Sequence, residues 1–320
     1  MQREFGGYIE LEQNRMPMMH EEAIALNCGR NCLAYLIQAK GIKKIALPYF
    51  LCDSVENVCR REGVEILHYH INQNFLPDKI DLEKGEWLYL VNFYGQLENR
   101  EIERYAAWHS QIIVDHAQAY YQEPLAGVDT LYTCRKFFGV PDGGFLYTDV
   151  VWTNELPRDE SFERMHFLLG RYERTASEFY SEYSANNRMF STEPVKRMSK
   201  LTPNLLQGID YKYIELKRTE NYAYLKFVFD KVNLLSLREV AGAYMYPLFV
   251  KGGAKIREKL QKEKIYIPTL WPHVLKTCAE NSVEYQMTKD ILPLPVDQRY
   301  NLEDMRYLAG RVMECINCGN

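Results

Sequence analysis

Residues 112–118 read Ile-Ile-Val-Asp-His-Ala-Gln, three β-branched residues followed directly by an acid. Three β-branched side chains in a row are typical of a short buried strand. Ligands of α/β sheets bind at the carboxyl ends of the strands, which is where Asp115 stands. An acid at this position is also a common helix N-cap. The stretch therefore predicts a strand that ends on either a ligand-binding carboxylate or a cap.

Strand-like apolar runs alternate with helix-like stretches through the first half of the chain. This alternation predicts an α/β fold, with a mainly parallel sheet and helices on both faces. We expect strands at 44–48, 64–69, 87–93, 111–114 and 144–147, and helices at 30–39, 53–63 and 99–108.

The second half has a different character and predicts a small C-terminal α+β domain. A charged, aromatic, helical stretch covers 162–184, and a long helix is expected over about 203–231, with Thr202 as its N-cap. After it we expect a strand, a helix, a strand and a helix, at 245–250, 254–262, 265–268 and 301–316. The predicted division is a large α/β domain, 1–230, that includes the long helix, and a small domain, 231–320.

Composition and charge exclude several classes of protein. The 320 residues are 47% hydrophobic and 26% charged, as in ordinary globular proteins, and carry a net charge of −4. That charge argues against an extended nucleic-acid interface, and no apolar run is long enough to cross a bilayer. The chain shows no secretory leader, so we expect its eight cysteines to be free thiols in the cytoplasm. Cys315 and Cys318 form half a zinc motif without a second half, so no metal site is expected.

Two further segments add chemistry to Asp115. In the first, Gly29 opens a helix, and free backbone N–H groups at such an end form an anion site. In the second, Lys136 lies among aromatic residues and precedes Asp142-Gly143-Gly144; partial desolvation of this lysine would lower its pKa and make it a nucleophile. Singly, these segments are equally consistent with a turn and a solvated lysine. Together they match the needs of pyridoxal phosphate (PLP): a lysine for the aldehyde, a carboxylate for the pyridine nitrogen and a cradle for the phosphate.

The sequence resembles the DegT/DnrJ/EryC1/StrS aminotransferases, a fold-type-I PLP family. The resemblance rests on Asp115-His116-Ala117-Gln118, on Lys136 before a glycine-rich turn, and on Cys28-Gly29-Arg30 as the phosphate loop. Supporting matches, which extend the likeness over about residues 6–316, are Asn92-Phe93-Tyr94-Gly95-Gln96, Met198-Ser199-Lys200-Leu201-Thr202 and Ile291-Leu292-Pro293-Leu294-Pro295.

The resemblance implies a role for each site residue. Lys136 would form the Schiff base with the cofactor and carry the proton, and Asp115 would pair with the pyridine nitrogen. The cofactor contacts it implies are Gln118 near the ring 3-oxygen, the main chain of Gly29 and Arg30 and the hydroxyl of Thr133 at the phosphate, and Phe50 over the ring, with Tyr49 and Cys52 as alternatives. A partner-chain asparagine corresponds to Asn186 or to the position of Val195.

The implied activity is transfer of an amino group from an amino-acid donor, glutamate, to a keto sugar or related carbonyl compound in sugar or polysaccharide biosynthesis. The implied assembly is a homodimer. Two alternatives stay open: another PLP reaction, such as elimination or decarboxylation, and a PLP-binding protein without turnover. Either Arg30 or Arg135 is expected to hold the donor carboxylate.

Overall fold

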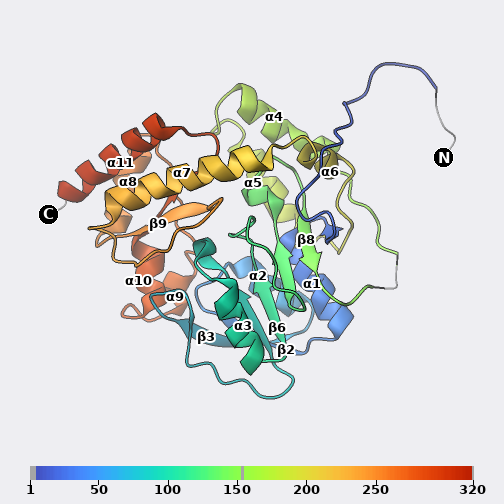
Figure 1. Ribbon diagram of the computed structural model, residues 1–320, viewed down its shortest axis with the longest axis horizontal. Coiled ribbons are helices and arrows are strands. Elements are labelled where there is room, and N and C mark those ends of the chain that lie inside the picture. The colour runs from blue at the N-terminus through green and yellow to red at the C-terminus, as the bar shows by residue number, and fades with distance from the viewer. Residues whose placement is uncertain (1–4, 153–154, 319–320) are drawn as a thin grey trace.

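The computed structural model describes residues 5–152 and 155–318, which form an α/β fold (Figure 1). The large sheet of this part of the chain has eight strands in the order β1-β8-β7-β6-β5-β2-β3-β4. The run from β7 to β3 is parallel, and β8, β1 and β4 are antiparallel to their neighbours. Its strands are β1 (Ile24–Leu26), β2 (Lys44–Pro48), β3 (Glu65–Ile71), β4 (Pro77–Asp78), β5 (Trp87–Val91), β6 (Ile112–Asp115), β7 (Asp129–Tyr132) and β8 (Gly144–Tyr147).

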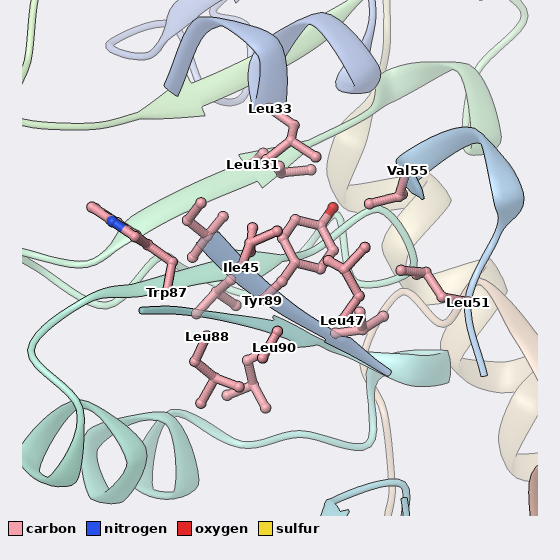
Figure 2. Close-up of a cluster of buried hydrophobic side chains, with 14 of the residues drawn as sticks. Leu33, Ile45, Leu47, Leu51, Val55, Trp87, Leu88, Tyr89, Leu90 and Leu131 are labelled. Carbon is pink, nitrogen blue, oxygen red and sulfur yellow. The ribbon is translucent and has the colours of Figure 1, made fainter. Parts of the chain in front are cut away.

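Helices cover both faces of this sheet, as the alternating pattern predicted. Every residue of β5 is buried, which requires cover on each side. Figure 2 shows Leu33 of α1 (Gly29–Lys40) over one face and Leu88 and Leu90 of β5 on the opposite face. The other helices are α2 (Asp53–Arg61), α3 (Asn99–Trp108), α4 (His166–Glu173), α5 (Tyr180–Met189), α6 (Leu201–Leu206), α7 (Tyr211–Phe229), α8 (Gly253–Lys262), α9 (Val274–Thr277), α10 (Val283–Asp290) and α11 (Leu302–Asn317).

A second, smaller core lies in the C-terminal third of the chain. Its sheet pairs β9 (Met245–Phe249) antiparallel with β10 (Ile291–Pro295). The apolar sides of α7, α8 and α11 pack on it, and Figure 1 shows these elements gathered at one end of the molecule. Because Tyr222, Leu225 and Phe229 of α7 belong to this core, the helix packs with the small sheet. The domain boundary near residue 230 stays a prediction.

Two predicted elements are wrong. The long helix over 203–231 is two helices, because the chain turns between α6 and α7 and Asp210 starts a new helix by accepting a hydrogen bond from the Tyr213 N–H at 2.9 Å. Thr202 is not an N-cap; its hydroxyl donates to the buried carboxylate of Asp142. The predicted strand at 265–268 has no regular secondary structure, and β10 pairs with β9 in its place.

Candidate active site

Asp115 is the last residue of β6, and its carboxylate is buried and held from two sides. The Tyr89 hydroxyl of β5 donates to one carboxylate oxygen at 2.9 Å, and the Ala117 N–H donates to the other at 2.7 Å. Burial raises the pKa of Asp115, while Lys136 acts in the opposite sense. A buried carboxylate with two fixed donors is well suited to pair with a single positive group.

Lys136 ends a 3₁₀ turn, Cys134–Lys136, between β7 and β8. Its amine lies 5.5 Å from the centre of the Tyr244 ring. Burial lowers the pKa of Lys136, and the nearby charge of Asp115 opposes that shift. The residue as a whole is nonetheless exposed to solvent in this chain. A lysine with a lowered pKa is a nucleophile at neutral pH.

The predicted phosphate loop lies beside Thr133 and the glycine-rich turn. The Cys28 side chain does not cap α1, so the first N–H groups of the helix have no partner within the helix. A Cβ built on Gly29 would lie 3.6 Å from the Thr133 Cβ, which places the two residues in contact. The Thr133 hydroxyl donates to the Gly143 carbonyl at 3.2 Å. These groups form one polar corner at the start of α1.

The Gly143-Gly144 pair is needed because two backbones meet there. The Gly143 N–H donates to the Asn27 carbonyl at 2.7 Å. A Cβ on Gly144 would lie 2.6 Å from the Cys28 carbonyl carbon and 2.7 Å from the Gly29 nitrogen. Gly143 also has φ +123°, which L-residues rarely adopt. The turn after Lys136 thus closes directly onto the loop that opens α1.

Gln118 and Phe50 differ in how they fit their expected places. The Gln118 side chain is buried, and its oxygen accepts the Tyr94 N–H at 2.8 Å. Phe50 is 1% exposed and packs against Phe93 and Trp271 in the main core. No face of that ring is left for a ligand, so the expected role of Phe50 as the ring cover does not fit the structure.

Tyr49 and Cys52, the two alternatives to Phe50 as the ring cover, differ in their surroundings. Tyr49 stacks on His68, with ring centres 4.8 Å apart. Cys52 lies near Lys136, and its sulfur accepts a hydrogen bond from the Ser54 hydroxyl at 3.0 Å. Among the three, Cys52 is the residue placed by the lysine.

The arginines and the asparagine of the sequence analysis surround the same turn. The Arg135 guanidinium donates to Asn187 at 2.5 Å and lies 4.6 Å from the centre of the Phe190 ring. Arg30 is the second residue of α1, and the charges of both arginines act on Cys28 and Lys136. Asn186 is buried and donates to the Pro141 carbonyl at 2.9 Å, so in this subunit it supports the glycine-rich turn.

Sequence reasoning missed Tyr89 and Tyr244. The signal for Tyr89 was available, because it is the one hydroxyl-bearing side chain in the apolar run Trp-Leu-Tyr-Leu-Val. Tyr244 lies 108 residues after Lys136, just before β9, and no local pattern connects the two.

Comparison with known proteins adds structural neighbours. No protein-family model and no curated protein matches the sequence. Among solved structures, NtdA from Bacillus subtilis, with bound cofactor PMP, is 17% identical and aligns with a TM-score of 0.67 over 92% of this chain and 73% of its own. DesV from S. venezuelae is 14% identical, with a TM-score of 0.65 over 91% and 84% of the two chains.

A third neighbour is a DegT DnrJ EryC1 StrS aminotransferase from Brucella abortus, which is 15% identical and has a TM-score of 0.61 over 91% of this chain and 85% of its own. The chain has the fold of these aminotransferases. The fold expected from the resemblance is therefore confirmed over nine-tenths of the sequence. In this fold, Asp115-His116-Ala117-Gln118 begins at the end of β6, Lys136 ends the turn after the neighbouring strand β7, and Cys28-Gly29-Arg30 opens α1.

Proposed function

We propose that this chain is a PLP-dependent aminotransferase that moves an amino group from an amino-acid donor, glutamate, to a keto sugar or related carbonyl compound. The observation that carries the proposal is geometric: the buried Asp115 carboxylate is held by two donors at the end of β6, and Lys136 lies in the turn that follows the neighbouring strand β7. The aminotransferase fold supports it, and so does the description of the neighbour CalS13 from Micromonospora echinospora as a sugar aminotransferase.

The residues present fit the cofactor. The Asp115 carboxylate is buried and anchored, as a partner for a protonated ring nitrogen must be. The N–H groups of Gly29 and Arg30 at the start of α1, with the Thr133 hydroxyl beside them, offer donors for a phosphate. The Cys28–Gly29 backbone occupies the space that a side chain at Gly144 would need, so the two backbones pack directly against each other. We assign Gln118 to the ring's 3-oxygen and Cys52, in place of Phe50, to the ring face.

The side chains divide the chemical work. When bound, PLP supplies the electron sink that stabilises negative charge on the donor's α-carbon. The Lys136 amine would accept the α-proton at Nζ and return it elsewhere, and burial, which lowers its pKa, favours the neutral form that this role needs. Asp115 holds positive charge on the ring nitrogen through an oxygen oriented by Tyr89. The Tyr244 ring lies 5.5 Å from the Lys136 amine and forms one side of its surroundings.

Assembly and location belong to the same proposal. We infer a homodimer, because α4 and α5 expose large apolar residues such as Leu169, Tyr172 and Tyr180, as an interface does. Light scattering at micromolar concentration should give twice the chain mass, and a monomer would contradict this.

The eight cysteines are free, which agrees with a cytoplasmic location. In the described part of the chain, no helix combines the length and apolar character needed to span a bilayer.

A donor half-reaction tests the proposed function. Glutamate alone, added to the protein loaded with PLP, should convert the cofactor's absorbance to that of the amine form and release one equivalent of 2-oxoglutarate. An elimination or decarboxylation enzyme would release product repeatedly without leaving the amine form. A binding protein without turnover would keep its spectrum with every amino acid of a donor panel. Either of the last two outcomes overturns the aminotransferase assignment.

A further inference from the structure

Arg218 of α7 is a fully buried arginine whose guanidinium binds main-chain carbonyls. It is 1% exposed. It donates to the Phe137 carbonyl at 3.1 Å, to the Ala243 carbonyl at 2.9 Å and to the Gln298 side-chain oxygen at 2.9 Å, with a longer bond of 3.5 Å to the Tyr244 carbonyl. Within the described residues it forms no ion pair, although the nearby charge of Asp297 raises its pKa against the effect of burial.

The carbonyls bound by Arg218 belong to the two segments that meet at the candidate lysine. Phe137 directly follows Lys136 in the chain, and its ring lies 4.7 Å from the guanidinium carbon. Tyr244 presents its ring to the Lys136 amine. Gln298 binds the same Phe137 carbonyl from a third segment, at 2.9 Å. One side chain thus ties the lysine turn, the loop before β9 and the loop after β10 together.

Burying the Arg218 guanidinium costs desolvation free energy, which suggests that its fixed donor geometry has a role. A buried guanidinium loses hydration that carbonyls only partly replace, and an apolar side chain of similar size is often equally stable in such a place. Burial lowers the pKa of Arg218 to about 10, which reflects the cost. What arginine supplies and an apolar residue does not is a rigid fork of five donors that holds several acceptors at fixed angles.

We propose that Arg218 is a positioning residue, which sets Lys136 and Tyr244 against each other by holding the carbonyls on either side of them. The inference rests on the proposed function in that Lys136 is taken as the residue that binds PLP. It predicts that loss of the fork misplaces the lysine amine even when the protein stays folded. A misplacement of about 1 Å at a reacting group is enough to cost roughly 100-fold in rate.

The test compares Arg218→Met with a matched variant, Asn221→Ala. Asn221 lies one turn farther along α7, is fully buried and also donates to several carbonyls, those of Val296, Asp297 and Tyr300, but none of these adjoins the lysine turn. Both variants lose buried hydrogen bonds from the same helix. Gln298→Leu removes the second donor to the Phe137 carbonyl and serves if Arg218→Met does not fold.

Two readouts separate positioning from stability. The first is the rate of covalent PLP capture, trapped with borohydride and quantified on the Lys136 peptide. The second, without cofactor, is the acetylation rate of Lys136 by acetic anhydride relative to that of Lys226, a half-buried lysine of α7 in an ion pair with Glu239. We expect Arg218→Met to slow capture roughly tenfold or more and to change the relative acetylation rate, while Asn221→Ala leaves both unchanged.

The outcomes distinguish the two proposals. If Arg218→Met and Asn221→Ala behave alike in both readouts, Arg218 is only a structural residue and the inference is overturned. If the unaltered protein captures no PLP, the proposed function fails, and the acetylation comparison alone then decides the role of Arg218. Arg218→Lys keeps the charge without the fork, so full recovery of both rates in that variant would also contradict the inference.

Discussion

Replacing Gly144 with alanine tests whether the close approach of the glycine-rich turn positions the polar corner at the start of α1. The added Cβ would lie 2.6 Å from the Cys28 carbonyl carbon, 2.7 Å from the Gly29 nitrogen and 2.9 Å from the Cys28 oxygen. All three are backbone atoms, so no rotamer change relieves the overlap. Ordinary contact begins near 3.4 Å, and the two backbones must therefore separate by about 0.8 Å.

This displacement sets the expected magnitudes. Overpacking of this kind typically lowers the free energy of unfolding by about 1–3 kcal/mol. The same shift moves the N–H groups of Gly29 and Arg30 relative to Thr133, and we expect PLP affinity to fall by roughly 10- to 100-fold. Affinity for pyridoxal, which lacks the phosphate, should change much less, because the displaced groups face only the phosphate.

Gly310→Ala is the matched control. Gly310 is an exposed residue of α11, and nothing lies within 4 Å of a Cβ built on it. That substitution should stabilise the protein by about 0.4–1 kcal/mol and leave PLP binding unchanged. The assays are urea unfolding of the protein without cofactor and absorbance titration with PLP and with pyridoxal. Wild-type stability and wild-type PLP affinity in Gly144→Ala would refute the proposed close approach of the two backbones.

Two further perturbations probe buried titratable groups. Asp115→Asn should lower turnover by about 100-fold or more, because the ring nitrogen loses its anionic partner. The same substitution should stabilise the protein without cofactor at pH values above the raised pKa of Asp115, because the wild type then carries a buried charge. An unchanged turnover number would remove Asp115 from the mechanism. Burial lowers the pKa of His20 from 6.5 to about 4 in the folded protein, so between pH 6.5 and 4 the unfolded protein binds more protons than the folded protein. The free energy of unfolding should therefore fall as the pH drops from 6.5 to 4, by on the order of 3 kcal/mol more in the wild type than in His20→Leu. Parallel stability curves for wild type and His20→Leu would show that His20 does not carry this dependence.

Local patterns were enough to predict the fold, and the site residues that they indicate stay predictions. The β-branched run before Asp115 correctly predicted β6, and the helix expected over 30–39 is α1, which ends at Gly41 in the left-handed conformation. Alternation of strands and helices predicted the parallel sheet because each buried strand needs a covering helix. The structure has Gly29 at the start of α1, Asp115 at the end of β6 and Lys136 in the turn after β7, and their roles stay predictions.

Features that depend on tertiary contacts could not be predicted from local sequence patterns. Phe50 is aromatic and near the expected position, but its ring packs against Trp271 from a distant segment. The break between α6 and α7 lies just before a single capping aspartate, Asp210, inside a stretch that otherwise has helical character. Arg218 reads as one more charge on a helix, and only the folded structure brings the Phe137 and Ala243 carbonyls to it.

The most direct test of the account is to locate the covalent bond to PLP. The purified protein is incubated with PLP, reduced with borohydride, digested and analysed by mass spectrometry. The account predicts one pyridoxyl group per chain, on Lys136, and none in Lys136→Ala. A pyridoxyl group mapped to another lysine, or its persistence in Lys136→Ala, would contradict the central claim.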